Sequence, residues 1–129
     1  MIVLDTSVWV AALRGKEPEI GERVRQLLDA DEVGLPVAVR VEILSGASVE
    51  DSRRLKRVLS ALPLSYPSER TWSRIEDWVD RGVAAGERFG VGDLLVAAIA
   101  VDGECKLWSL DGDFQRMADL GFVELYRPD

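Results

Sequence analysis

The most informative absence in this chain of 129 residues is histidine, which does not occur at all. Histidine is the usual general base for serine and cysteine nucleophiles and a usual ligand of zinc. Its absence argues against those hydrolases, against most zinc sites and against the metal-free ribonucleases that depend on histidine. Any catalysis must therefore use carboxylates, hydroxyls, lysine and arginine.

Cysteine and long apolar runs are also scarce. The single cysteine, Cys105, excludes an internal disulfide and a cysteine-rich zinc site, and its position predicts a buried core thiol. The apolar runs are far shorter than the roughly 20 residues of a membrane helix. The start "MIVLDTSVW" lacks the basic flank and cleavage site of a signal peptide. We therefore expect a protein of the cytoplasm.

The charge balance is acidic, with a net charge of −7, 47% hydrophobic and 30% charged residues. This composition suits one globular domain over residues 1–129. The acid excess argues against broad, non-specific nucleic-acid binding, because such binding depends on phosphate neutralisation by lysine and arginine. A nuclease is still allowed, since an acidic metal site itself adds negative charge. The run "RRLKR" at 53–57, with Arg14 and Lys16, is either a solvated helix face or a local basic rim.

Short aliphatic runs alternate with helical patterns along the chain. This alternation predicts an α/β domain with a central parallel sheet of about five short strands flanked by helices. The expected strands are 1–4, 33–35, 64–66, 106–110 and 122–125. The expected helices are 6–14, 18–30, 36–47, 50–62, 68–88, 93–103 and 113–119. Pro18 and Pro36 suit the first turns of their helices. Ser68 and Asp93 suit N-cap positions.

The helix expected at 68–88 carries apolar residues on neighbouring faces. This pattern is typical of a core helix or a subunit contact. The residues are Trp72, Ile75, Trp78, Val79 and Val83.

Aspartates directly follow two of the predicted strands. Asp5 follows strand 1–4, and Asp111 follows the strand that ends at Leu110. In open parallel sheets, ligand sites form outside the carboxyl ends of strands, near the point where the strand order reverses. If the two strands are neighbours, the two side chains therefore open into one crevice.

Other acids stand near the same place, although each acid alone also has a structural explanation. Asp93 begins the apolar helix "DLLVAAIAV", and Glu42 borders the apolar stripe of its own helix. Asp5 and Asp93 suit N-caps, Asp111 with Asp113 suits a turn, and Glu42 suits a solvated helix edge. Together, carboxylates in one crevice repel one another, so some must protonate or a hard divalent cation must bind.

Oxygen ligands favour Mg²⁺ or Mn²⁺, which activate water and neutralise charge on a phosphoryl group. The acids therefore predict phosphodiester hydrolysis without histidine. In this scheme the ion lowers the pKa of its bound water, and the resulting hydroxide attacks phosphorus in line. A second ion or a hydroxyl from Thr6, Ser7 or Ser109 helps to hold the scissile phosphate or a ligand water.

Four segments, taken together, resemble the PIN-domain ribonucleases of the VapC toxin type. They are "IVLDTSVWV", "VEILSGA", "GVGDLLVAAIA" and "KLWSLDGDF", in the family's order and at about its spacing, and they span nearly the whole chain. The resemblance implies an Mg²⁺- or Mn²⁺-dependent endoribonuclease whose substrate is RNA, such as tRNA or rRNA. It places the family's acids at Asp5, Glu42, Asp93 and Asp111. Asp113 matches a further position that is often acidic, and Ser109 stands where the family commonly has threonine.

The resemblance also implies partners. It predicts a homodimer held inactive by a VapB-like antitoxin, whose C-terminal segment covers the site, often with an arginine that reaches the carboxylates. Two alternatives keep the fold: a PIN nuclease of RNA processing, and a non-catalytic regulatory PIN domain that binds nucleic acid. Two other families fit less well. The chain ends too soon after Asp113 for a haloacid dehalogenase phosphatase, and Asp5 lacks the paired acid of a receiver domain.

Overall fold

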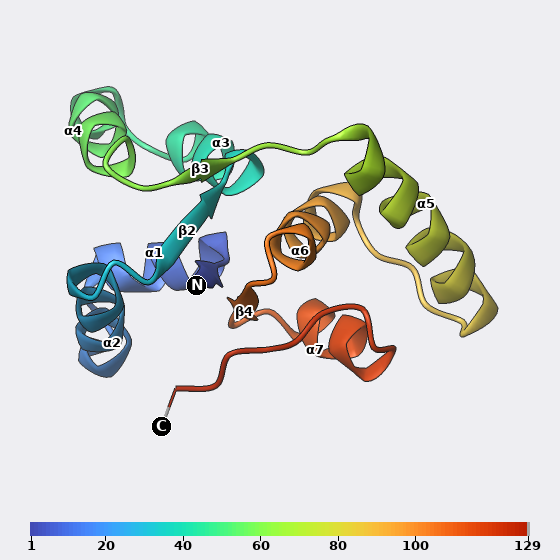
Figure 1. Cartoon of the computed structure of the whole chain (residues 1–129). Helices are drawn as coiled ribbons and strands as arrows, with labels where there is room; N and C mark the ends of the chain where they lie inside the picture. The colour runs from blue at the N-terminus through green and yellow to red at the C-terminus, as the bar shows by residue number, and fades with distance from the viewer. Residues whose placement is uncertain (129) are drawn as a thin grey trace.

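The computed structural model describes residues 1–128 and shows a parallel sheet between helices (Figure 1). The strands are β1 (Ile2–Leu4), β2 (Val33–Pro36), β3 (Leu64–Ser65) and β4 (Lys106–Trp108). Their order is β3-β2-β1-β4, and every pair is parallel. The chain builds outward from β1 through β2 to β3 and then returns to place β4 on the other side of β1. The order therefore reverses between β1 and β4, which is where open α/β sheets bind ligands.

The fifth predicted strand, 122–125, forms a single parallel bridge in which Leu125 pairs with Leu107 of β4. The amide of Leu107 donates to the carbonyl of Glu124 at 3.0 Å, and the amide of Tyr126 donates to the carbonyl of Leu107 at 2.8 Å. This segment thus extends the sheet beyond β4 by one short contact. The predicted α/β architecture with a parallel sheet is confirmed.

The strand β4 ends at Trp108, two residues before the predicted end at Leu110. The reason lies in side-chain hydrogen bonds that take over from the ladder. The amide of Leu110 donates to Ser7 Oγ at 3.0 Å, and the amide of Asp111 donates to Ser109 Oγ at 2.9 Å. The chain therefore turns toward the carboxyl end of β1 as soon as β4 ends.

Helices fill the connections at about the predicted places. They are α1 (Thr6–Arg14), α2 (Pro18–Asp29), α3 (Val37–Ser45), α4 (Val49–Leu59), α5 (Glu69–Ala84), α6 (Val91–Asp102) and α7 (Gly112–Asp119). Pro18 occupies the first turn of α2, and Ser68 caps α5 through a hydrogen bond from the Thr71 amide at 3.4 Å, as predicted. Pro36 is the N-cap of α3 and so precedes its first turn.

The predicted start of α6 at Asp93 is wrong by two residues. The helix begins at Val91, and the extended residue Gly90 is its N-cap. Asp93 therefore lies inside the first turn, where its carboxylate makes no cap. Gly90 and Gly92 on either side of Val91 favour a loop by propensity, so the sequence pattern places the start too late.

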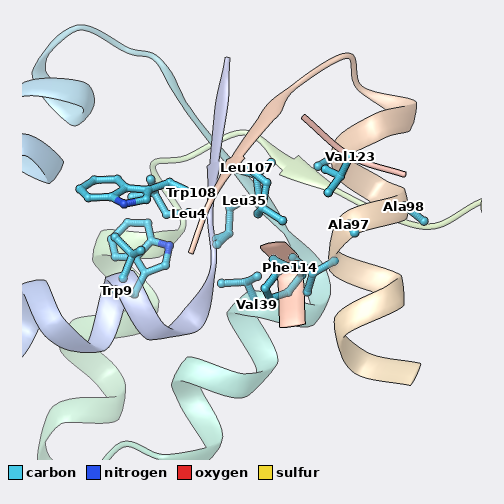
Figure 2. Close-up of a cluster of buried hydrophobic side chains, with 14 of the residues drawn as sticks. Leu4, Trp9, Leu35, Val39, Ala97, Ala98, Leu107, Trp108, Phe114 and Val123 are labelled. Atoms are coloured by element: carbon cyan, nitrogen blue, oxygen red, sulfur yellow. The ribbon is translucent and has the colours of Figure 1, made fainter. Parts of the chain in front are cut away.

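The helices α1 and α2 lie on one side of the strands and α5, α6 and α7 on the other, while α3 and α4 lie together at the top of the view (Figure 1). Figure 2 shows Leu35, Leu107 and Phe114 between the strands and α6, while Trp9 and Trp108 lie on the opposite side. The helix α6 is apolar nearly all round because it packs on α5, α7 and the sheet. This burial fixes the position of its first turn against the strand ends.

The predicted burial of Cys105 in the core is wrong. Cys105 is half-buried because it lies in the turn between α6 and β4, where its Sγ donates to the Gly103 carbonyl at 3.4 Å.

Among residues 1–128, no helix has the length and apolarity needed to span a membrane, and the cytoplasmic location stays a prediction. The domain end predicted at residue 129 lies outside the described residues.

The helix α5 divides its apolar residues between the core and the surface. Ile75 and Trp78 are buried, and the indole of Trp78 stacks on Phe122 with 4.8 Å between ring centroids. Trp72, Val79 and Val83 are exposed. Trp72, Val79 and Val83 lie on one side of the helix and are only partly covered by the other residues of 1–128.

Candidate active site

The first acid of the site, Asp5, leaves the end of the central strand β1 and caps α1. Its side chain is only 6% exposed. The amide of Asp5 donates to the carbonyl of Trp108 at 2.9 Å, which ties it to the end of the neighbouring strand β4. The reversal of strand order between β1 and β4 therefore holds a buried carboxylate.

Two serine hydroxyls hold the Asp5 carboxylate. Ser7 Oγ and Ser109 Oγ each donate to Asp5 Oδ2 at 2.8 Å, and the Ser7 amide reaches the same oxygen at 3.4 Å. Within residues 1–128 all of these hydrogen bonds go to Oδ2 and none goes to Oδ1. Ser7 and Ser109 thus donate to Asp5, and their role in holding a phosphate or a water stays a prediction. Ser109 also accepts from the Asp111 amide, so the hydroxyl network links two of the predicted acids.

Three aspartates form the tightest acidic group. Carboxylate oxygens of Asp93, Asp111 and Asp113 lie within 4.8 Å of one another. Asp93 comes from the first turn of α6, Asp111 is the N-cap of α7, and Asp113 follows in the first turn of α7. The Asp111 carboxylate accepts from the Asp113 amide at 2.9 Å. Two helix N-termini, whose dipoles favour negative charge, thus bring the three acids together.

The electrostatics of Asp93 show that the acids act on one another. The pKa of Asp93 is raised from the ordinary 3.8 to about 6, chiefly by burial and then by the carboxylates of Asp111, Asp5, Asp113 and Glu42, in that order. All five acids named by the sequence therefore lie at one edge of the sheet, although Asp5 and Glu42 stand outside the tightest group. Such mutual repulsion favours either protonation or cation binding.

Glu42 faces this edge from α3. Partial burial of its carboxyl raises the pKa of Glu42, and the charge of Asp5 raises it further. The nearby Thr6 hydroxyl lowers it again, although the contact does not meet the geometry of a hydrogen bond. Thr6 Oγ1 is buried and has no hydrogen-bond partner among residues 1–128. A buried polar atom without a partner beside two acids suits a bound water or ligand oxygen.

Arg116 contacts the acidic group and is not among the site residues predicted from the sequence. Its guanidinium donates to Asp113 and to Glu87 and lies 5.0 Å from the centroid of the Phe89 ring. Within residues 1–128 it is the one cation paired with any of the five acids. The spacing of three residues between Asp113 and Arg116 on a helix is a signal that sequence inspection can find.

The residues present fit a hard divalent cation. They supply three carboxylates that lie within 4.8 Å of one another, the nearby carboxylates of Asp5 and Glu42, and the Thr6 hydroxyl, which has no hydrogen-bond partner among residues 1–128. Mg²⁺ and Mn²⁺ prefer such oxygen ligands, whereas the site offers no sulfur or imidazole. The acidic group is therefore a candidate divalent-metal site.

Comparison with known families decides what kind of domain carries this site. The profile of the PIN domain matches residues 2–120. The chain belongs to the PIN domain family. The sequence resemblance to PIN-domain ribonucleases of the VapC type is thereby confirmed, and it extends over most of the chain.

Relatives of this PIN domain include named ribonucleases. Ribonuclease VapC11 of Mycobacterium tuberculosis is 30% identical over 131 residues, an alignment that covers 92% of each chain. Two solved structures share the fold. VapBC-1 from nontypeable Haemophilus influenzae has a TM-score of 0.76 at 24% identity, covering 98% of this chain and 97% of that chain. VapBC2 from Rickettsia felis, bound to a promoter DNA fragment, has a TM-score of 0.80 at 20% identity, with both chains covered fully at 100%.

Proposed function

We propose that this PIN domain is a divalent-metal-dependent endoribonuclease and the toxin of a toxin–antitoxin pair. The observation that carries the proposal is the convergence of five acids on the switch point between β1 and β4, with the pKa of Asp93 raised to about 6. Its similarity to VapC ribonucleases supports RNA as the substrate class. Mg²⁺ or Mn²⁺ is the proposed ion.

The roles of the acids follow from their positions. We assign Asp5, Asp93 and Asp111 as the principal ligands, with Glu42 beside them and Asp113 as a further acid. When bound, the ion supplies positive charge that attracts an RNA phosphate and acidifies water. Ser7 and Ser109 keep the Asp5 carboxylate oriented. Thr6 Oγ1 is available to hold a phosphate oxygen or a water.

The reaction is hydrolysis of a phosphodiester. The oxygen of water forms a bond to phosphorus, the bond from phosphorus to the 3′ oxygen breaks, and a proton passes to that leaving oxygen. The products therefore carry a 5′-phosphate and a 3′-hydroxyl.

The test of this activity is cleavage of single-stranded RNA with Mg²⁺, with Mn²⁺ and with EDTA, followed by end-group determination. We expect cleavage with either ion, none in EDTA, and 5′-phosphate ends. A 2′,3′-cyclic phosphate product would contradict attack by water. Binding of RNA without cleavage in every metal would instead favour a regulatory PIN domain.

The partner proposal rests on a groove beside the site. The groove has a volume of about 380 Å³ and runs from Glu42 between α1, α3 and α4. Leu13, Ile43 and Leu55 give it apolar walls, and Arg14, Arg54 and Asp51 give it charges of both signs. An amphipathic segment of an antitoxin fits such walls and would end next to the acids. Solved relatives described as VapBC assemblies support this choice of partner.

The partner proposal is tested by co-expression with the product of the gene directly upstream. We expect a complex that co-purifies and has suppressed ribonuclease activity, whereas the chain expressed alone slows growth. Leu13→Glu, which places a charge on the wall of the groove, should weaken the complex without stopping RNA cleavage. A harmless chain with no co-purifying neighbour would overturn the toxin proposal while leaving the nuclease proposal standing.

We also propose a homodimer through the exposed side of α5. Trp72 and Val79 are each 44% exposed, and Val83 is 45% exposed. Uncovered apolar side chains on one helix face are typical of a subunit contact. Sedimentation analysis should show a dimer for the wild type and a monomer for Trp72→Glu, and a monomeric wild type would contradict this proposal.

A further inference from the structure

Arg116 is held in place on three sides. Its Nη2 donates to Asp113 Oδ1, its Nη1 donates to Glu87 Oε2, and its guanidinium carbon lies 5.0 Å from the centroid of the Phe89 ring. Arg116 lies one turn beyond Asp113 on α7, whereas Glu87 and Phe89 belong to the connection between α5 and α6. The guanidinium therefore joins this connection to the acidic group.

The connection is folded tightly enough to bring Glu87 to Arg116. The Glu87 amide donates to the carbonyl of Gly82 at 2.8 Å, and Gly86 has a φ of +77°. A Cβ on Gly82 would lie 3.2 Å from the Glu87 carbonyl oxygen, a tight contact that would require the turn to shift by a few tenths of an ångström. Glu87 thus belongs to a turn whose start is held by a hydrogen bond to the last turn of α5.

The charges along this chain of contacts alternate in sign. Asp113 is one of the three acids whose oxygens lie within 4.8 Å of one another, Arg116 is positive, and Glu87 is negative. The positive charge of Arg116 reduces the repulsion among the acids. The negative charge of Glu87 partly neutralises Arg116 and so weakens this effect. Because the guanidinium and a metal ion are both cations, they compete for the negative charge of the same group.

We propose that Arg116 is a positioning residue that lowers the metal affinity of the acidic site, and that Glu87 limits this effect by partly neutralising the Arg116 charge. This inference rests on the proposed function, since it requires that the site binds a divalent ion. Loss of the Arg116 charge leaves Asp113 free and Glu87 unpaired, so cation affinity rises. Loss of the Glu87 charge leaves Arg116 to act on the acids alone, so cation affinity falls.

The experiment is calorimetric titration of the full chain with Mn²⁺ and Mg²⁺ in the absence of RNA. We expect Arg116→Gln to bind either ion about three- to tenfold more tightly than the wild type, and Glu87→Gln to bind about two- to fivefold more weakly. Arg116→Lys keeps the charge and should stay within about twofold of the wild type. The matched controls are Arg25→Gln and Glu22→Gln, which break an exposed ion pair on α2 and change the net charge equally.

The opposite signs separate a role in metal affinity from a structural role. If Arg116 and Glu87 only stabilised the turn, both neutralising variants would shift the affinity in the same direction, and that result overturns the inference. Unchanged affinity in both variants overturns it as well. A wild type that binds no divalent ion overturns the proposed function and this inference with it. If Arg116→Gln does not fold by circular dichroism, weaker binding by Glu87→Gln, with no change in Glu22→Gln, supports the inference and equal binding overturns it.

Discussion

The two ends of α6 hold aspartates in opposite surroundings. Asp93, in the first turn, faces four other acids and has no paired cation among residues 1–128. Asp102, the last residue of α6, accepts from the buried Thr71 hydroxyl at 2.5 Å and from Arg74 Nε at 3.0 Å. The helix dipole favours Asp93 and disfavours Asp102. The pairing of Asp102 stabilises the fold at the unfavourable end, whereas the repulsion at Asp93 is what its proposed role as a metal ligand requires.

The largest expected effect is the loss of RNA cleavage in Asp93→Asn. The variant removes one negative charge from the candidate metal site while keeping the shape of the side chain, so we expect cleavage to fall at least about a thousandfold. The measurement is initial rate at saturating Mg²⁺. Asp102→Asn at the other end of the same helix is the control and should keep wild-type activity. Equal losses of RNA cleavage in Asp93→Asn and Asp102→Asn would contradict the separate roles of the two aspartates.

The next largest effect is a loss of stability in Asp102→Ala. This change leaves Thr71, which is 1% exposed, and Arg74 without their shared partner. We expect the free energy of unfolding to fall by about 1–3 kcal/mol. Urea unfolding measures it, and RNA cleavage per folded molecule should not change. A variant as stable as the wild type would mean that the Asp102 pair contributes nothing to the fold.

A smaller effect concerns pH and the metal-free protein. Because the folded chain raises the pKa of Asp93 to about 6 from 3.8, it binds the Asp93 proton more tightly than the unfolded chain. The resulting stabilisation is present below pH 3.8 and is lost as the pH rises through about 6. In EDTA, Asp93→Asn should therefore gain stability over the wild type across this range, reaching about 1 kcal/mol at neutral pH after allowance for partial exposure. An advantage that stays constant with pH would contradict the shift.

The smallest effect concerns the hydroxyl at position 109. Ser109→Ala removes a donor to Asp5 and an acceptor for the Asp111 amide, so we expect a loss of about 1 kcal/mol in unfolding free energy. Ser109→Thr retains the hydroxyl and should lie within about 0.5 kcal/mol of the wild type, with cleavage nearly unchanged. Thermal unfolding of the two variants side by side provides the measurement. A large loss in the threonine variant would mean that the strand end lacks room for one methyl group.

The sequence predicts the acidic edge because its signals are local. Asp5 directly follows the aliphatic run of β1, and "DLLVAAIAV" is too apolar to lie anywhere except between other elements. Once β1 and β4 are assigned as parallel neighbours, the topology of open α/β sheets brings the acids that follow them together. Glu42 is predicted from its position beside the apolar stripe of its helix, and the resemblance to PIN ribonucleases gives it the same role, but its place beside Asp5 depends on helix packing.

The contacts that the sequence did not predict join residues far apart along the chain. Glu87 meets Arg116 across 29 positions, and Thr71 meets Asp102 across 31. No periodic pattern encodes such pairs, since each side chain alone looks like an ordinary surface residue. The early end of β4 has the same cause, because Ser7 withdraws the Leu110 amide from the ladder across 103 positions.

The central place of β1 has a consequence during synthesis. The strand that emerges first needs β4 as one of its two neighbours, and the hydrogen bond from Ser109 to Asp5 spans 104 positions. A contact between residues so far apart in the sequence forms only after most of the chain has left the ribosome. Asp93, Asp111 and Asp113 arrive equally late. A nascent or prematurely terminated chain that lacks β4 and α7 therefore lacks the assembled acidic edge.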